Sequence, residues 1–184
     1  MSLTIDDEYR NVIKTRKHAL LPSLMVDNGL AAIEFYKNVL DAKLLYLLQY
    51  KDKVTHAELM IGDSSIMLAD IFQDWGTSNK SGNMAFTLYL YVDDVDQTCQ
   101  KATINGATVD HPPKDEFYGD RMCSFVDPFG FRWVVAKKVK DISDQEILDG
   151  QEKMFNNIQF GSGNNKYYKK YLKYKVKYDK LINN

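Results

Sequence analysis

The sequence predicts an α+β protein built from two tandem βαβββ modules, and three observations lead to this prediction. First, a strand, a helix and three strands occur in that order before a polar stretch at 73–83 and again after it. Second, the segment LMVDNGLAAIEFYKNVLDA resembles the later segment LYVDDVDQTCQKATINGA, as internal duplication would produce. Third, two apolar runs flank Asp127-Pro128-Phe129-Gly130, and such a turn between two strands predicts a closing hairpin.

Length and composition are those of an ordinary globular protein. The chain has 184 residues, of which 45% are hydrophobic and 27% charged, and its net charge of -1 gives no overall footprint for nucleic acid. No apolar run reaches the roughly 20 residues of a membrane span, and the first residues lack the apolar core of a signal peptide. Cys99 and Cys123 are too few for a disulfide framework and lie in apolar patterns. We therefore expect a cytoplasmic protein with two buried thiols and no membrane contact.

The first module is expected at 20–71, after an N-terminal segment at 1–19. Strands are predicted at 20–26, 44–50, 54–61 and 65–70. Asn28 can cap a helix between the first two of these strands. The apolar residues of this helix recur with helical spacing and form one face, which consists of Ala32, Phe35, Tyr36, Val39 and Leu40.

The second module is expected at 85–138, after a linker loop at 72–84. It begins with a strand at 85–92, and Asp94 can cap the following helix. The inner face of that helix is expected to consist of Val95, Thr98, Cys99 and Ala102. A short strand at 108–111 and the hairpin around Asp127 complete the module.

The C-terminal part predicts a helical extension and a tail. Ser143 and Glu146 have the spacing of a capping box, so a helix is expected within 139–160. The Lys- and Tyr-rich tail at 161–184 shows both a helical and a strand-like spacing of its apolar residues. It is interpreted as a helix packed on the body or on a partner subunit. A solvated extension and a segment that stacks on nucleic acid are the alternatives.

Several phrases of the chain resemble one known family, over residues 20–147. They are AIEFYKNVLDA, HAELMIGDSSIMLAD, LYLYVDDVD, FYGDR, DPFGFRW and KDISDQEI. They are similar to the PhnB-like branch of the vicinal oxygen chelate superfamily, which contains glyoxalases, bleomycin-resistance proteins and extradiol dioxygenases. The resemblance implies a curved mixed sheet around a cavity that holds a small molecule, and a homodimer. One departure is that Phe131 stands where this branch usually has His after the turn.

The resemblance also implies a divalent metal, bound by His, Gln or Glu from the first and last strand of each module. The corresponding positions here are Leu21, Met67, Thr87 and Val134. None of them is a normal ligand for such an ion. We therefore expect no metal and no cofactor. A metal-dependent lyase, isomerase or dioxygenase of the same superfamily is the alternative.

His56 and Glu58 are the candidate catalytic residues. Residues two apart on a strand face the same side, and in the fold that the resemblance implies this side is the concave one. A carboxylate beside a His can orient it for acid or base chemistry. A pair at the rim or surface of the cavity is the alternative interpretation.

Six residues are predicted to contact a ligand: Met67, Thr87, Tyr118, Arg121, Phe131 and Trp133. Arg121 could hold a carboxylate or phosphate, or it could form a structural salt bridge. Phe131 and Trp133 could form an aromatic wall, or they could be core residues. Trp75, in the polar loop, suggests a lid or a subunit contact.

The sequence thus predicts a small-molecule-binding protein without the family metal site, and it names no reaction. His56 and Glu58 leave open an enzyme of the glyoxalase/dioxygenase superfamily. A non-catalytic interaction protein that uses its basic tail is the third alternative.

Overall fold

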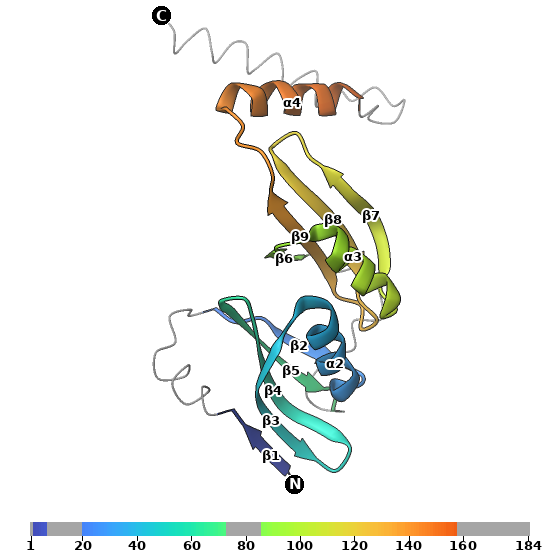
Figure 1. Ribbon diagram of the computed structural model, residues 1–184. Coiled ribbons are helices and arrows are strands. Elements are labelled where there is room, and N and C mark those ends of the chain that lie inside the picture. Colours follow the sequence, from blue (N-terminus) through green and yellow to red (C-terminus); the bar gives the residue numbers. More distant parts are fainter. Residues whose placement is uncertain (1, 7–19, 73–85, 158–184) are drawn as a thin grey trace, which may run out of the picture. The chain divides into compact units, whose positions relative to one another are not determined.

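The computed structural model describes residues 2–6, 20–72 and 86–157, and within them it confirms the α+β fold. The described residues form two mixed sheets, of five and four strands, and three helices (Figure 1). The residues up to Asp141 belong to one compact unit and those from Ile142 onward to a second. The predictions about Trp75, the loop from residue 73 onward and the tail concern residues outside the described ranges.

The first sheet has the strand order β1-β3-β4-β5-β2. The predicted module supplies β2 (Ser23–Val26), α2 (Gly29–Leu40), β3 (Lys43–Tyr50), β4 (Lys53–Ile61) and β5 (Ser64–Asp70). The helix connects β2 to β3, and β2 pairs in parallel with β5. An additional strand, β1 (Ser2–Ile5), pairs antiparallel with β3. The sequence pattern did not predict β1, because its hydrogen-bond partners lie more than 40 residues further along the chain.

The second sheet repeats this arrangement with the order β6-β9-β8-β7. Its elements are β6 (Leu88–Tyr91), α3 (Val95–Ile104), β7 (Thr108–Asp115), β8 (Asp120–Val126) and β9 (Arg132–Lys138). The strand β7 runs past Pro112 and Pro113 and is longer than predicted. Proline is tolerated there because β7 is an edge strand, where a missing N–H costs no ladder hydrogen bond.

Both module helices begin at the predicted caps. The side chain of Asn28 accepts a hydrogen bond from the Ala31 N–H (3.1 Å), and that of Asp94 accepts one from the Gln97 N–H (2.9 Å). The predicted apolar faces of the two helices are buried. These faces and the facing sides of both sheets contribute to one continuous hydrophobic core.

Asp127, at the start of the Asp-Pro-Phe-Gly turn, links the two modules within this core. Its carboxylate accepts hydrogen bonds from the Tyr36 hydroxyl on α2 (2.8 Å) and from Trp133 Nε1 (3.0 Å). The backbone N–H groups of Phe129 and Phe131 donate to the same carboxylate, each at 2.9 Å. The hydroxyl of Tyr36, in the first module, therefore has its hydrogen-bond acceptor in the turn of the second module.

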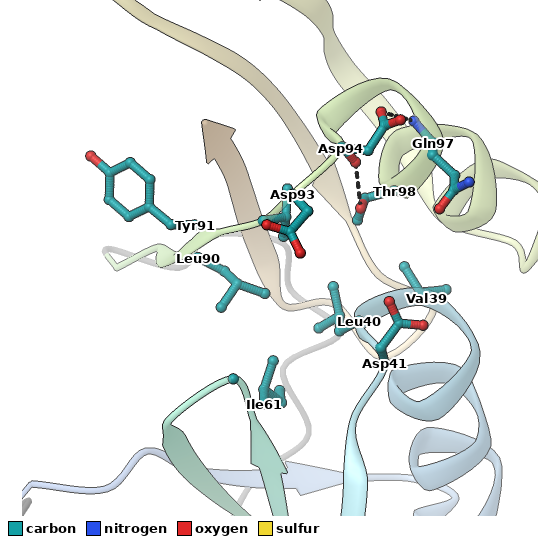
Figure 2. Close-up of a pocket in the computed structure, with 12 residues that line it drawn as sticks. Val39, Leu40, Asp41, Ile61, Leu90, Tyr91, Asp93, Asp94, Gln97 and Thr98 are labelled. Carbon is teal, nitrogen blue, oxygen red and sulfur yellow. Dashed lines mark hydrogen bonds between the residues drawn. The ribbon is translucent and has the colours of Figure 1, made fainter. Parts of the chain in front are cut away.

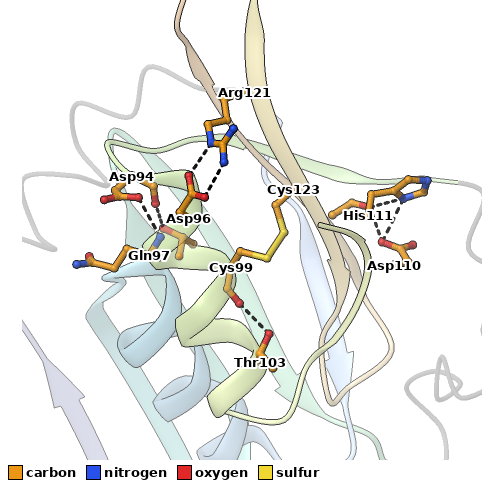
Figure 3. Close-up of a disulfide and its surroundings, with 11 residues drawn as sticks. Asp94, Asp96, Gln97, Cys99, Thr103, Asp110, His111, Arg121 and Cys123 are labelled. Atoms are coloured by element: carbon orange, nitrogen blue, oxygen red, sulfur yellow. Dashed lines mark hydrogen bonds and ion pairs between the residues drawn. A yellow bond between two sulfur atoms is a disulfide. The ribbon is translucent and has the colours of Figure 1, made fainter. Parts of the chain in front are cut away.

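The two cysteines form a disulfide, so the prediction of two buried thiols is wrong (Figure 3). The apolar patterns correctly place both residues in the core, at 5% and 0% exposure. Packing of α3 on β8 then brings the Cα atoms of Cys99 and Cys123 to 6.4 Å, a separation that a disulfide spans. The pairing depends on this tertiary contact and has no signal in the sequence.

The second unit contains the predicted C-terminal helix, α4 (Asp144–Asn157). Glu146 Oε2 accepts hydrogen bonds from the Ser143 N–H (2.9 Å) and hydroxyl (2.7 Å), as in a capping box. Among the described residues, no helix is long and apolar enough to cross a membrane.

Candidate functional site

The first sheet has a second face that turns away from α2, and β4 places the two candidate catalytic residues on it. Along β4, Ala57, Leu59 and Ile61 belong to the hydrophobic core. Because side chains alternate along a strand, His56 and Glu58 point to the opposite face. The structure therefore brings these two residues together on one side of the sheet.

Glu58 lies in the middle of this face, and its exposed fraction is 0%. Its cross-strand neighbours are Tyr46 on β3 and Met67 on β5. The ring of Tyr46 also lies edge-on to that of His56, with centroids 5.6 Å apart. Met67 is thus beside Glu58. Tyr46 also belongs to this group, and the sequence interpretation did not name it, because a register shift between Leu44 and Tyr46 interrupts the alternation of β3.

The remaining predicted ligand contacts do not join this group. Thr87 is exposed and precedes β6. Phe131 and Trp133 are core residues, exposed by only 5% and 3%. Arg121 holds two carboxylates. Its Nε and Nη2 lie 2.6 and 2.7 Å from Asp96 (Figure 3), and its Nη1 lies 2.8 Å from Asp115. It has the geometry of the structural salt bridge that was the alternative interpretation.

Tyr118 belongs to a separate polar group on the second module. The Tyr91 hydroxyl donates to Asp120 (3.0 Å), and Lys138 Nζ donates to the Tyr118 carbonyl oxygen (2.9 Å). Burial raises the pKa of Tyr89, and its neighbours Tyr118, Tyr91 and Asp120 raise it further. The pKa of Tyr118 is raised as well, chiefly by burial. These phenols therefore remain protonated at neutral pH and can donate hydrogen bonds.

Two cavities lie where the modules meet. One, of about 470 Å³, is lined by the end of α2, the β4–β5 turn, β6 and the start of α3 (Figure 2). Two of its three carboxylates have partners, since Asp41 pairs with Lys101 (3.0 Å) and Asp94 caps α3. The other, of about 310 Å³, is mostly apolar, and Trp133 forms part of its wall. Trp133 therefore combines a core position with a cavity wall.

The positions expected for metal ligands do not fit a divalent ion. Leu21 and Val134 have no donor atom, the Met67 thioether is a soft ligand, and Thr87 is an isolated hydroxyl outside the strands. Among the described residues, no group of three or more His, Cys, Asp or Glu side chains could hold a metal ion. The absence of a metal remains a prediction, because other parts of the chain are not described.

Known proteins resemble this chain in sequence and in fold. The sequence model of the Glyoxalase/Bleomycin resistance protein/Dioxygenase superfamily matches residues 17–135. An uncharacterized protein of Mycobacterium bovis is 37% identical over 135 residues, which are 70% of this chain and 89% of that protein. A PhnB protein from Bacillus cereus has a similar fold, with a TM-score of 0.53 and 16% identity over 65% of this chain and 99% of its own. The fosfomycin resistance protein FosX from Mesorhizobium loti has a TM-score of 0.50 and 15% identity over 72% of this chain and 98% of its own. The chain therefore belongs to the Glyoxalase/Bleomycin resistance protein/Dioxygenase superfamily.

Proposed function

We propose that the protein binds a small organic molecule on the face of the first sheet that carries Glu58, without the metal of its superfamily. The position of Glu58 carries this proposal. A carboxyl side chain with 0% exposure lies on the sheet face opposite the hydrophobic core, where folding does not require an acid. Buried acidic groups of this kind are more typical of binding sites than of a packed interior.

The surroundings of Glu58 have the composition of a ligand pocket. Thioether and aliphatic side chains from β2, β3, β4 and β5 share its face, namely Met25, Leu48, Met60 and Met67. Ligand pockets are mostly apolar with a few polar groups that orient the ligand, and Met adapts to irregular shapes. Tyr46, His56 and Glu58 are the polar groups here. Since a carboxyl group offers acceptor oxygens, the ligand is expected to carry an amine, amidine or hydroxyl group.

The pair of His56 and Glu58 also keeps acid–base catalysis as the second candidate function. Both side chains lie on one strand face, two residues apart, and both can transfer protons. A reaction would proceed by proton transfer between this pair and the bound molecule, since the metal-ligand positions do not fit a divalent ion. FosX is a fosfomycin resistance protein, and drug binding by the present chain is one form that small-molecule binding could take.

The proposal is tested by ligand-observed NMR with two fragment sets, one of amines and alcohols and one of carboxylic acids. The wild-type protein should bind members of the first set, and Glu58→Gln should weaken them by tenfold or more. Met67→Trp should abolish binding by filling the face. Leu30→Trp, on the exposed side of α2, serves as the matched control and should bind as the wild type does. Equal binding by wild type, Glu58→Gln and Met67→Trp would exclude this face as the site.

A further inference from the structure

The second sheet carries a polar group that is distinct from the Glu58 face. Asp110, His111, Ser124 and Arg132 come from β7, β8 and β9. A β-bulge lies between Val109, which pairs with Phe125, and His111, which pairs with Ser124. The bulge directs both Asp110 and His111 toward Ser124, because a bulged strand sets two residues opposite one. The neighbours of Ser124 along β8, Cys123 and Phe125, are core residues, so Ser124 faces away from α3.

These four side chains form a directed chain of contacts. The Ser124 hydroxyl donates a hydrogen bond to Asp110 Oδ1. Nδ1 of His111 lies 2.9 Å from the Ser124 oxygen and 3.5 Å from Asp110 Oδ1. Arg132 Nη1 forms an ion pair with the second oxygen of Asp110. Figure 3 shows Asp110 and His111 turned toward one another.

The order of donors and acceptors determines which nitrogen of His111 carries the proton. Burial raises the pKa of Asp110, but the Ser124 hydrogen bond and the Arg132 charge outweigh it and hold that pKa below its usual value. Asp110 is thus an ionised acceptor at neutral pH. The single hydroxyl proton of Ser124 is used toward Asp110, so the Ser124 oxygen can only accept from His111. Nδ1 of His111 must therefore be protonated, and in the neutral ring the lone pair is on Nε2.

The His111 side chain is exposed, so a ligand can reach the lone pair on its Nε2. Ser124 is buried, with 2% exposure, whereas the side chain of His111 is 69% exposed and that of Arg132 is 40% exposed. The ion pair of Arg132 involves Nη1, whereas a guanidinium has five N–H donors in all. A cationic donor group and a basic nitrogen thus lie on either side of one carboxylate. A carboxylate or phosphate is the group that Arg donors match best.

We propose that Asp110, His111, Ser124 and Arg132 form a second site, which takes a small carboxylate- or phosphate-bearing molecule and in which Nε2 of His111 accepts a proton from it. The donated proton comes from an O–H, or from a C–H next to a carbonyl, beside the anionic group. The electron pair of the broken bond stays on the ligand, where Arg132 faces the negative charge. The new imidazolium is stabilised by Asp110 through Ser124. This site lies on another sheet and does not depend on the function proposed for the Glu58 face.

The orientation of His111 is tested by NMR of the full chain with ¹⁵N-labelled histidine, recorded above neutral pH. The chain has three His residues, and loss of one signal set in His111→Gln assigns the relevant ring. We expect a protonated Nδ1 and an unprotonated Nε2 in the wild type, and a shift toward the ordinary Nε2–H form in Ser124→Ala. A wild-type ring protonated at Nε2 would overturn the inference.

The anion site is tested with inorganic phosphate as the probe. Titration should shift the signals of His111 and of the Arg132 side chain to saturation, and Arg132→Gln should weaken binding at least tenfold. Lys37→Gln, a cation of similar exposure on α2, is the control and should bind phosphate as the wild type does. Shifts that do not saturate, or that are equal in Arg132→Gln, would exclude the anion site.

Discussion

At the scale of single residues, the surroundings of Asp127 and Asp96 shift the pKa values of these two side chains in opposite directions. Burial raises the pKa of Asp127, although Phe131, Tyr36, Trp133 and Phe129 all donate hydrogen bonds to it. Asp96 is exposed, and its hydrogen bonds from Arg121 lower its pKa. The first carboxylate organises the core at a cost of desolvation, and the second stabilises the surface of α3.

Replacing Asp127 by Asn should destabilise the protein by about 1–3 kcal/mol, because an amide nitrogen would face donors that need an acceptor. The measurement is the free energy of unfolding in urea near neutral pH. Asp141→Asn, at an exposed position, is the control and should change little. A loss as small as that of the control would show that the four donors of Asp127 find other partners.

Asp96 should make stability depend on pH in the acid range. Its pKa is lowered in the folded protein, so its contribution is present above the unfolded carboxyl pKa of about 4. The contribution is lost as pH falls through the lower folded value, because the folded state must then bind a proton against the Arg121 interaction. Asp96→Asn should therefore be less stable than the wild type near neutral pH, and the difference should shrink in acid. Urea unfolding at several pH values measures this, and a difference that is constant with pH would contradict it.

At the scale of elements, α3 is held on β8 by two unlike connections. The disulfide joins Cys99 to Cys123, and Arg121 joins Asp96 at the start of the helix to Asp115 at the end of β7. Hydrophobic contact provides the rest of the interface. The position of α3 bears on the proposed second site, because the second sheet, with the group around His111, lies against this helix.

Breaking the disulfide should lower the free energy of unfolding by about 3–4 kcal/mol, as the chain-entropy relation gives for cysteines 24 residues apart. Thermal unfolding of the wild type with and without reductant, and of Cys99→Ala with Cys123→Ala, measures this. The two treatments should agree, since both remove the same link. Unequal losses would mean that packing of the sulfur atoms matters more than the link.

The same pair tests the predicted cytoplasmic location. Reducing compartments keep most thiols unpaired, so a disulfide in protein alkylated at lysis would argue for an oxidising environment or a redox role. Alkylation followed by mass spectrometry decides between the paired and the free form. Two alkylated cysteines would indicate that the pair is reduced in the cell.

At the scale of the whole molecule, the sheets leave edges that a second chain can cover. Within the described residues, β2 and β6 each pair on one side only. Large aromatic side chains on and beside β6 are exposed, namely Phe86, Tyr89 and Tyr91. Open edges and exposed apolar groups are liabilities that partners usually cover. Members of this superfamily often form dimers, and we propose a homodimer here.

Light scattering at tens of micromolar should therefore give the mass of a dimer. Tyr91→Lys should favour the monomer, because a charge would replace an aromatic contact beside the open edge. Tyr50→Lys, a Tyr of comparable exposure at the end of β3, should remain dimeric. A monomeric wild type would contradict the proposal, and a monomeric Tyr50→Lys would place the interface at the first sheet instead.

Metal addition should change neither stability nor activity. Leu21, Met67, Thr87 and Val134 do not fit the ion, and a catalytic site needs about three protein donors. Thermal unfolding with added Zn, Ni, Mn or Fe is compared with unfolding in the presence of a chelator. A rise of many degrees, lost in His56→Ala, would restore the metalloenzyme alternative.

The elements that depend on local chemistry could be predicted from the amino-acid sequence. The helix faces of α2 and α3, their Asn28 and Asp94 caps and the hairpin at Asp127 follow from residues close in the chain. The shared side of His56 and Glu58 follows from strand alternation. The phrases common to the superfamily indicated the order in which these elements pack.

The contacts between side chains far apart in the sequence became visible only in the folded chain. Tyr36 and Asp127 are 91 residues apart, and no local pattern relates them. The same holds for the Cys99–Cys123 disulfide, the pairing of Arg121 with Asp96 and the strand β1. The group of Asp110, His111, Ser124 and Arg132 also depends on a β-bulge, which shifts the register that alternation predicts. Periodicity specifies which face a residue occupies, but contact requires the relative placement of whole elements, and that placement is determined by packing of the common core.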